Sequence, residues 1–317
     1  MEPLDDAKFS GTKEVAEHLT IEVSNLQPWI DEFVPGAGKI NSIEQFKGGQ
    51  SNPTYKIVTE SKNLVLRRKP PGKLLPSAHA VDREYKVITA LYQTDVPVPK
   101  TYGLCENDEI AGTAFFVMDF LDGDLFWNPM IPSLSNQDRT EIYQNKNKTL
   151  ALLHGVDYKK IGLEDYGKPG NYVARQVARW SKQYRASETD DIEAMNNLID
   201  WLPKNIPDDD ETSIVHGDYR LDNMILKNNQ VMGVLDWELS TLGHPIADFS
   251  YHCLSWRTQE AFWDQAKLKE LGVPSEKEYM DMYCENTGKD LSKNWEFYMA
   301  FNMFKIAGIL QGILGRV

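Results

Sequence analysis

A polar stretch between two short apolar runs constrains the fold of this chain more than any other part of the sequence. The apolar runs are 213–215 and 231–235, and 224–227 has the pattern of a further short strand. The turn at 227–230 contains Asn-Asn, and asparagine tolerates the left-handed backbone of a tight hairpin. The sequence therefore predicts a hairpin with three oxygen-bearing side chains at one end: Asp218, Asn223 and Asp236.

These three side chains suit phosphoryl transfer. That reaction needs a base for the attacking hydroxyl and oxygen ligands for a metal ion. We expect Asp218 to be the catalytic base. Asn223 and Asp236 offer the amide and carboxylate oxygens that Mg²⁺ prefers and shares with substrate phosphates. The alternative is a polar hairpin with capping side chains, which would have to place the whole set by accident.

The motif around this hairpin carries a family resemblance. Starting at His216, the chain reads His-x-Asp-x-x-x-x-Asn, with a further Asp 13 positions later. Residues 243–248 are similar to a Gly-Asp-Pro-x-x-Asp segment, with His244 in place of the usual Asp. The chain thus resembles the aminoglycoside phosphotransferase and choline kinase-like family. Residues 48–52 and 66–73 look most like the kinase-like domain fused to some acyl-CoA dehydrogenases and its stand-alone bacterial relatives.

This resemblance implies an α+β fold of the protein kinase-like, two-lobed type. We expect a small antiparallel-sheet N-lobe with one key helix at 1–120, which binds the nucleotide. A larger, mainly helical C-lobe at 121–317 would carry the catalytic hairpin and the acceptor-binding helices. The implied cofactors are ATP (or GTP) and Mg²⁺. Four side chains are expected to support the site: His216 by bracing the loop, Asp248 by bonding amides of the same turn, and Asp222 and Glu238 as nearby acids.

Upstream, a glycine-containing loop joins the first two of three strand-like runs, which cover 40–47, 54–59 and 63–68. Glycine lets a backbone approach a ligand closely, and successive amides can face phosphate oxygens. An ordinary hairpin would use the same residues, but a basic residue one strand later favours a cover over nucleotide phosphates. The loop residues are Gly48, Gly49, Gln50, Ser51 and Asn52.

Arg67 is that basic residue. Kinases place a cation on the third strand, where it pairs with nucleotide phosphates and with a helix glutamate. The family usually has Lys here, and Arg can bind phosphate in bidentate fashion. Glu84 falls inside the apolar stripe of a helix predicted at 80–92, and a buried carboxylate is costly unless paired. We therefore predict an Arg67–Glu84 ion pair, with two exposed charges as the alternative.

The run 115–120 is apolar except at Asp119 and is followed by Gly123. We interpret it as a hinge strand whose backbone reads the purine edge, with Met118 and Phe120 beside the nucleotide. The domain boundary is placed near Leu121.

Composition excludes several classes of protein. The net charge of −13 argues against nucleic-acid partners and anionic membrane surfaces. Three cysteines without metal or redox spacing indicate reduced thiols in the cytoplasm. No basic-then-apolar signal segment begins the sequence. Residues 299–317 are apolar but contain Asn302, Lys305 and Gln311, which indicates a buried core helix rather than a membrane span. That helix stops without a cap, which leaves open whether the natural chain extends past residue 317.

The resulting hypothesis is a small-molecule kinase that phosphorylates a hydroxyl. The resemblance favours a hydroxyacyl-CoA as acceptor, and the basic cluster Arg67, Arg68, Lys69 and Lys73 suits an anionic ligand. An aminoglycoside- or choline-type phosphotransferase and a non-catalytic nucleotide sensor are the alternatives. A protein kinase fits worse, because Asp236-Trp237-Glu238 replaces Asp-Phe-Gly and no Gly-x-Gly-x-x-Gly loop or Ala-Pro-Glu segment occurs.

Overall fold

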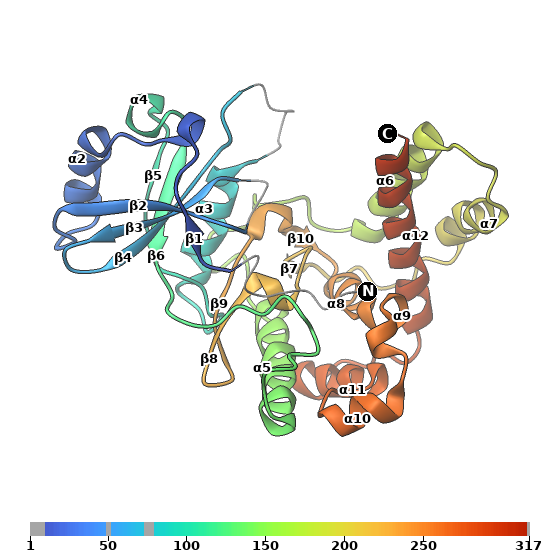
Figure 1. Cartoon of the computed structure of the whole chain (residues 1–317). Helices are drawn as coiled ribbons and strands as arrows, with labels where there is room; N and C mark the ends of the chain where they lie inside the picture. Colours follow the sequence, from blue (N-terminus) through green and yellow to red (C-terminus); the bar gives the residue numbers. More distant parts are fainter. Residues whose placement is uncertain (1–9, 49–51, 73–78, 316–317) are drawn as a thin grey trace. The chain divides into compact units, whose positions relative to one another are not determined.

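The structure is a computed structural model that describes residues 10–48, 52–72 and 79–315. It divides into two compact units (Figure 1). Unit 1 covers the described parts of Met1–Leu134 together with Arg220–Leu239, and unit 2 covers Ser135–Tyr219 and the described part of Ser240–Val317. This division differs from the expected boundary near Leu121. The hairpin groups with unit 1, where Val234 N donates to Pro97 O at 2.9 Å. Residues 121–134 group with it, because Asp124 pairs with Leu226 of the hairpin.

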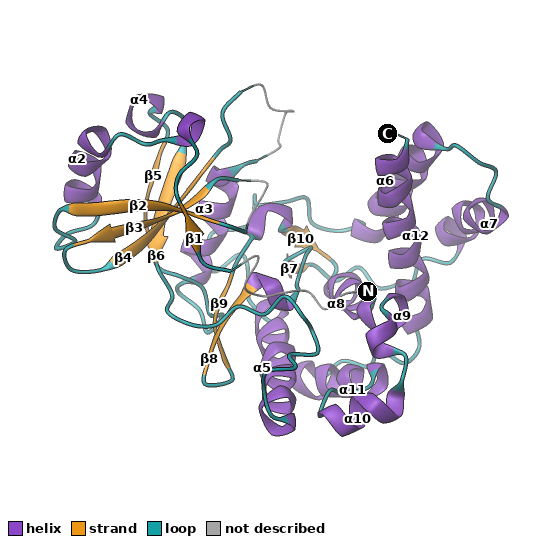
Figure 2. Cartoon of the chain, viewed as in Figure 1, coloured by secondary structure: helices purple, strands orange, loops and turns teal. Residues whose placement is uncertain are grey.

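Unit 1 is built on an antiparallel sheet of six strands in the order β1-β2-β3-β4-β6-β5 (Figure 2). The prediction of a small antiparallel sheet is confirmed. The side chains of a strand point alternately to its two faces, and β3 buries every second residue. One face of the sheet therefore packs on a core. The strands are β1 (Thr12–Lys13), β2 (Ile40–Phe46), β3 (Thr54–Thr59), β4 (Asn63–Arg68), β5 (Thr101–Cys105) and β6 (Phe115–Asp119).

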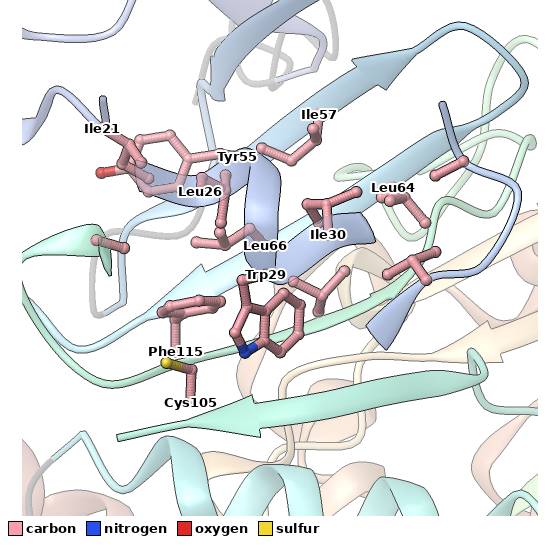
Figure 3. Packing of buried hydrophobic residues seen from close by; sticks show 14 residues of the cluster. Ile21, Leu26, Trp29, Ile30, Tyr55, Ile57, Leu64, Leu66, Cys105 and Phe115 are labelled. Atoms are coloured by element: carbon pink, nitrogen blue, oxygen red, sulfur yellow. The ribbon is translucent and has the colours of Figure 1, made fainter. Parts of the chain in front are cut away.

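Helix α2 (Val23–Phe33) covers this core with an apolar face (Figure 3). Leu26 and Ile30 are completely buried. The Trp29 ring packs edge-to-face against Phe115, with ring centroids 5.1 Å apart. The other helices of unit 1 are η1 (Glu17–Leu19), α3 (Val81–Leu91), α4 (Asp108–Ala111), η3 (Leu221–Asn223) and η4 (Trp237–Leu239).

The hairpin of unit 1 pairs β8 (Met224–Lys227) with β9 (Gln230–Val234). Asn228 and Asn229 both have positive φ, 51° and 62°, so the left-handed turn predicted from them is confirmed. The first apolar run, 213–215, lies outside this hairpin. That run forms β7 (Ser213–Val215), which pairs in unit 2 with β10 (Thr241–Gly243).

Unit 2 is mainly helical, as expected for the larger part of the chain. Its longest helix is α12, which packs on α6 and α8. In the part of the chain that the structure describes, α12 alone is long and apolar enough to cross a membrane by length and composition. Its buried Asn302 donates hydrogen bonds within unit 2, which fits the expected core helix. The helices are α5 (Asn136–His154), α6 (Tyr172–Ser187), α7 (Glu193–Trp201), η2 (Leu202–Lys204), α8 (Pro245–Cys253), α9 (Ser255–Thr258), η5 (Glu260–Phe262), α10 (Gln265–Leu271), α11 (Glu276–Thr287) and α12 (Trp295–Leu314).

The packing of α2 predicts a large difference between two truncations on one helix. Leu26→Ala removes fully buried methyl groups and should lower the free energy of unfolding by about 2–5 kcal/mol. Val23→Ala, at a side chain that is 40% exposed, should change it by less than about 0.5 kcal/mol. Denaturant unfolding of both variants measures the difference, and equal losses would contradict this account of the core.

Candidate functional site

In unit 1, the guanidinium of Arg67 on β4 pairs with two carboxylates at once. Its Nε lies 2.8 Å from Oε2 of Glu84 on α3, so the predicted ion pair is confirmed. Its Nη2 donates to Oδ1 of Asp236 at 2.6 Å, and Oε2 of Glu238 lies 3.9 Å away. The Arg67 and Glu84 side chains are 10% and 1% exposed, so this contact is largely shielded from water. The result is a buried cation between a helix carboxylate and the carboxylate after β9.

Asn52 holds the other oxygen of the same glutamate. It is completely buried, and its Nδ2 donates to Oε1 of Glu84 at 2.9 Å. His79, which the sequence did not single out, places Nδ1 3.0 Å from the Asn52 Oδ1. The side chain of Asn52 therefore positions Glu84, although the sequence suggested only that its backbone could cover phosphates. Gly48 lies just after β2, whereas Gly49, Gln50 and Ser51 lie outside the described residues.

Burial makes Glu84 unusually easy to protonate. The pKa of its carboxyl group is raised to about 7, and burial is the largest cause. The positive charge of Arg67 lowers this pKa, while the negative charges of Asp236 and Glu238 raise it. The ion pair thus depends on pH near neutrality.

Asp236 and Asn223 lie together at the open end of the hairpin. Leu235 N donates to Asn223 O at 2.8 Å, which brings the residue before Asp236 against Asn223. Asp236 adopts φ = 62°, a left-handed conformation that is uncommon for a residue other than glycine. The fully buried Trp237 fixes this turn, because its Nε1 donates to Val234 O at 2.9 Å.

The donor set at this end of the hairpin fits Mg²⁺ when a nucleotide supplies further oxygens. An amide and a carboxylate are hard oxygen ligands, and Mg²⁺ typically takes one or two from the protein and the rest from phosphates and water. Among the residues that the structure describes, no group of three or more His, Cys, Asp or Glu could hold a metal ion by itself. Of the two supporting acids, Asp222 is paired with Arg220 and Glu238 faces Arg67.

Two aromatic rings lie beside the predicted hinge. Phe46, at the end of β2, and Phe120, just after β6, are nearly parallel at 10° with centroids 6.4 Å apart. The Lys56 ammonium lies 5.0 Å from the Phe120 centroid. Met118 is buried and pairs across the sheet with Val65. The sequence did not identify Phe46, because nothing along the chain shows that the end of β2 meets the end of β6.

One member of the predicted basic cluster faces the interior of unit 1 instead of a ligand. Arg68 is buried, and its guanidinium donates to the carbonyls of Leu19 and Ala111. Lys69 lies 3.6 Å from Asp82. Arg68 is therefore not available to an anionic ligand, and the cluster argues less strongly for a coenzyme A site than its composition suggested; Lys73 lies outside the described residues.

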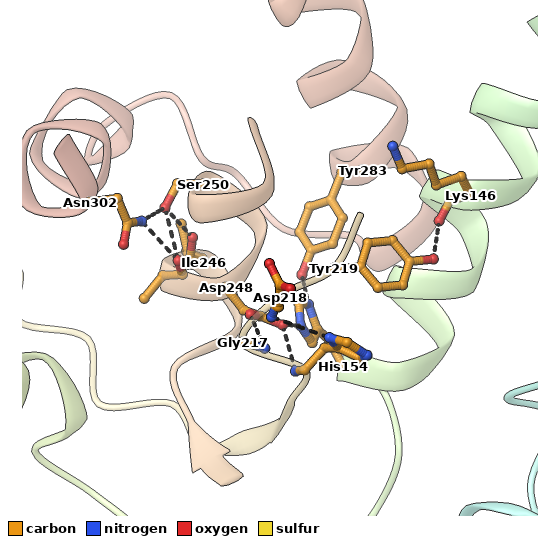
Figure 4. Close-up of polar contacts among 12 residues, drawn as sticks. Lys146, His154, Gly217, Asp218, Tyr219, Ile246, Asp248, Ser250, Tyr283 and Asn302 are labelled. Atoms are coloured by element: carbon orange, nitrogen blue, oxygen red, sulfur yellow. Dashed lines mark hydrogen bonds and ion pairs between the residues drawn. The ribbon is translucent and has the colours of Figure 1, made fainter. Parts of the chain in front are cut away.

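In unit 2, Asp248 on α8 holds the turn that follows β7 (Figure 4). Its Oδ2 accepts from the His216 amide at 2.8 Å, and its Oδ1 accepts from the Gly217 amide at 2.9 Å. The next amide, that of Asp218, donates to Nδ1 of His216 at 3.2 Å. These are the contacts expected of Asp248 and His216, and they fix the backbone that carries the half-buried Asp218.

A second histidine contacts Asp248. Nε2 of His154, at the end of α5, lies 3.2 Å from Asp248 Oδ2, and its Nδ1 lies 2.6 Å from the Tyr283 hydroxyl. Burial raises the pKa of Asp248, but its contacts with His154 and His216 lower it more, so the net pKa lies below the ordinary value. Asp248 therefore stays ionised and keeps accepting both amides.

Comparisons with known proteins match this arrangement. A model of the phosphotransferase enzyme family matches residues 42–283. The chain belongs to the phosphotransferase enzyme family. Its fold is kinase-like: choline kinase from Cryptosporidium parvum aligns with a TM-score of 0.62 over 93% of this chain and 95% of that chain, at 12% identity.

More similar relatives share much more of the sequence. Mouse acyl-CoA dehydrogenase family member 10 is 46% identical over 96% of this chain, which spans 29% of that longer protein. A crystal structure from Ralstonia eutropha with a provisional aminoglycoside phosphotransferase name is 49% identical, with a TM-score of 0.85 over 94% of this chain and 90% of that chain. The expected family, fold and phosphotransferase class are therefore confirmed.

The buried state of Glu84 predicts a pH-dependent stability. Because its folded pKa of about 7 exceeds the ordinary value of 4.5, the folded protein binds a proton that the unfolded chain has released. The free energy of unfolding of the wild type, relative to Glu84→Gln, should therefore fall as pH rises from about 5 to about 8. Denaturant titrations across this range measure the difference. If the free energy of unfolding of the wild type, relative to Glu84→Gln, rises with pH instead, the raised pKa of Glu84 is refuted.

Proposed function

We propose that this phosphotransferase moves the γ-phosphoryl group of ATP, or GTP, to a hydroxyl of a small metabolite, with a hydroxyacyl-CoA as the favoured acceptor. The observation that carries the proposal is the Arg67 contact with both Glu84 and Asp236. Kinases need a strand cation that is anchored by a helix glutamate and lies near a metal-binding aspartate. A structural ion pair would need only one of the two carboxylates.

In this proposal, unit 1 binds the nucleotide. Arg67 contacts its phosphates, which the backbone of Gly48 and Asn52 would cover. Phe46, Phe120 and the edge of β6 at Met118 contact the base, because two parallel aromatic rings offer flat faces for stacking. Solved aminoglycoside phosphotransferases bound to ADP or to AMP-PNP have the same fold as this chain, with TM-scores of 0.55.

The metal would be held by Asn223 and Asp236. Bound there, Mg²⁺ would neutralise phosphate charge and orient the nucleotide. Asp236 would then bind the metal in place of the Arg67 guanidinium, and Arg67 would contact the phosphates while it stays paired with Glu84. Glu238 and Asp222 remain as nearby acids.

Asp218 would accept the proton of the attacking hydroxyl. The Asp248 carboxylate holds the amides on its N-terminal side, so Asp218 is presented from a fixed turn rather than from a mobile loop. Such positioning matters because phosphoryl transfer offers little covalent chemistry to the protein and depends on orientation and charge.

The acceptor is argued from the relatives. The chain aligns with part of acyl-CoA dehydrogenase family members, so the substrate of the fused enzyme suggests an acyl-CoA that carries a hydroxyl group. Aminoglycoside and choline kinases share the fold at low identity, and fold alone does not fix the acceptor.

The test is ADP formation from Mg-ATP with hydroxyacyl-CoA thioesters, aminoglycosides and choline, with mass spectrometry of the products. We expect phosphorylated hydroxyacyl-CoA. Asp218→Asn should lower the turnover about 10²–10⁴-fold, because the base is lost, and should leave ATP affinity unchanged.

Asp281→Asn is the matched control, since Asp281 is an exposed side chain paired with Lys277 on α11. Full turnover in Asp218→Asn would refute the assigned base. Transfer to choline or aminoglycosides alone would refute the favoured acceptor but not the kinase.

A further inference from the structure

Helices α8 and α12 of unit 2 are fixed against each other close to the Asp218 turn (Figure 4). The buried Asn302 on α12 donates to Ala247 O at 2.9 Å and to Ser250 Oγ at 2.8 Å, both on α8. Asp248, which holds the turn, lies between these two residues on α8. One turn further along α12, residue 305 is therefore held at a defined place beside α8.

That residue is Lys305, and its ammonium lies 3.9 Å from the centroid of the Tyr251 ring. The side chain is half-buried. Within the described part of the chain it forms no hydrogen bond or ion pair. The charged groups that act on it are the carboxylates of Asp248 and Asp218 and the guanidinium of Arg179 on α6.

A cation in this position needs an explanation. Removing an ammonium group from water costs free energy unless a partner replaces its lost hydration, and the face of an aromatic ring replaces only part of it. Burial lowers the pKa of Lys305, the two carboxylates raise it and Arg179 lowers it, with a net decrease. Two backbone amides and His154 already contact the oxygens of Asp248, and this carboxylate forms no ion pair with Lys305 among the described residues.

We infer that Lys305 binds an acyl oxygen of the acceptor, next to the hydroxyl that Asp218 deprotonates. This inference rests on the proposed function and narrows its substrate class. An ammonium donates to the oxygen of a carboxylate or of a thioester carbonyl, and both are acyl oxygens. Arg179, which is exposed on α6, adds positive charge to the same region. A polycationic aminoglycoside or the quaternary ammonium of choline would be repelled there.

The experiment uses the full chain with a non-hydrolysable ATP analogue and Mg²⁺. Calorimetry measures binding of 3- and 4-hydroxybutyryl-CoA, the corresponding free hydroxybutyrates, choline and an aminoglycoside. Turnover with Mg-ATP is measured in parallel. The variants are Lys305→Met, which keeps the length of the side chain, and Lys305→Arg, which keeps the charge. Lys277→Met is the control, because Lys277 is exposed on α11. Thermal melting shows whether each variant is folded.

We expect Lys305→Met to weaken binding of the acyl acceptor about tenfold or more, as for loss of a charged hydrogen bond, and to leave the KM for ATP unchanged. Lys305→Arg should restore most of the affinity, and Lys277→Met should behave as wild type. The CoA and free-acid arms show whether the thioester carbonyl or the carboxylate is bound.

Equal acceptor binding by wild type and Lys305→Met would overturn the inference, as would a change in the KM for ATP alone. Acceptance of choline or an aminoglycoside without any acyl compound would also overturn it, while leaving phosphoryl transfer intact. Binding of the acyl compound that depends on Lys305, without transfer to any acceptor, would support the cation site and refute the proposed function.

Discussion

The contact of Arg67 with Glu84 and Asp236 is the interaction on which the first unit depends. It joins β4, α3 and the end of the β8–β9 hairpin through one guanidinium. A buried charge is tolerated only when it is well paired, so these three elements must be placed together. Asn52 then occupies the second oxygen of Glu84, which leaves that carboxylate compensated from two sides. Asp236, whose side chain is 30% exposed, is the least buried of the three partners.

A carboxylate plays the matching part in the second unit. Asp248 accepts two successive amides and is itself held by His154. The turn that carries Asp218 is thereby fixed by an ionised side chain rather than by strand pairing, since β7 is only three residues long. Each unit thus contains one buried charged residue with a proposed part in catalysis. In unit 1, Arg67 would bind the nucleotide phosphates; in unit 2, Asp248 holds the turn that carries the proposed base, Asp218.

Local patterns predicted much of this structure. Strand-like runs predicted β2, β3 and β4, the Asn-Asn turn predicted the β8–β9 hairpin, and the apolar stripe of α3 indicated that Glu84 is buried beside a cation. These features depend on neighbours a few residues apart, whose spacing the sequence displays directly.

The features that the sequence missed are contacts between distant segments. β7 pairs with β10 over three residues, too short for a periodic signal. Phe46 meets Phe120, and Arg68 turns into the core to bind main-chain carbonyls. The composition of a basic run shows charge but not the direction of each side chain, so it does not predict that Arg68 points inward. The apolar pattern of 299–317 likewise shows Lys305 only as a polar position in a core helix.

The measurement that tests the central claim most directly is a crystal structure with Mg²⁺ and a non-hydrolysable ATP analogue. The account predicts Mg²⁺ coordinated by the Asn223 amide oxygen and an Asp236 carboxylate oxygen at about 2.0–2.1 Å, with Arg67 on the phosphates and still paired with Glu84. A bound analogue whose metal ion touches neither Asn223 nor Asp236, with Arg67 still on Asp236, would contradict it.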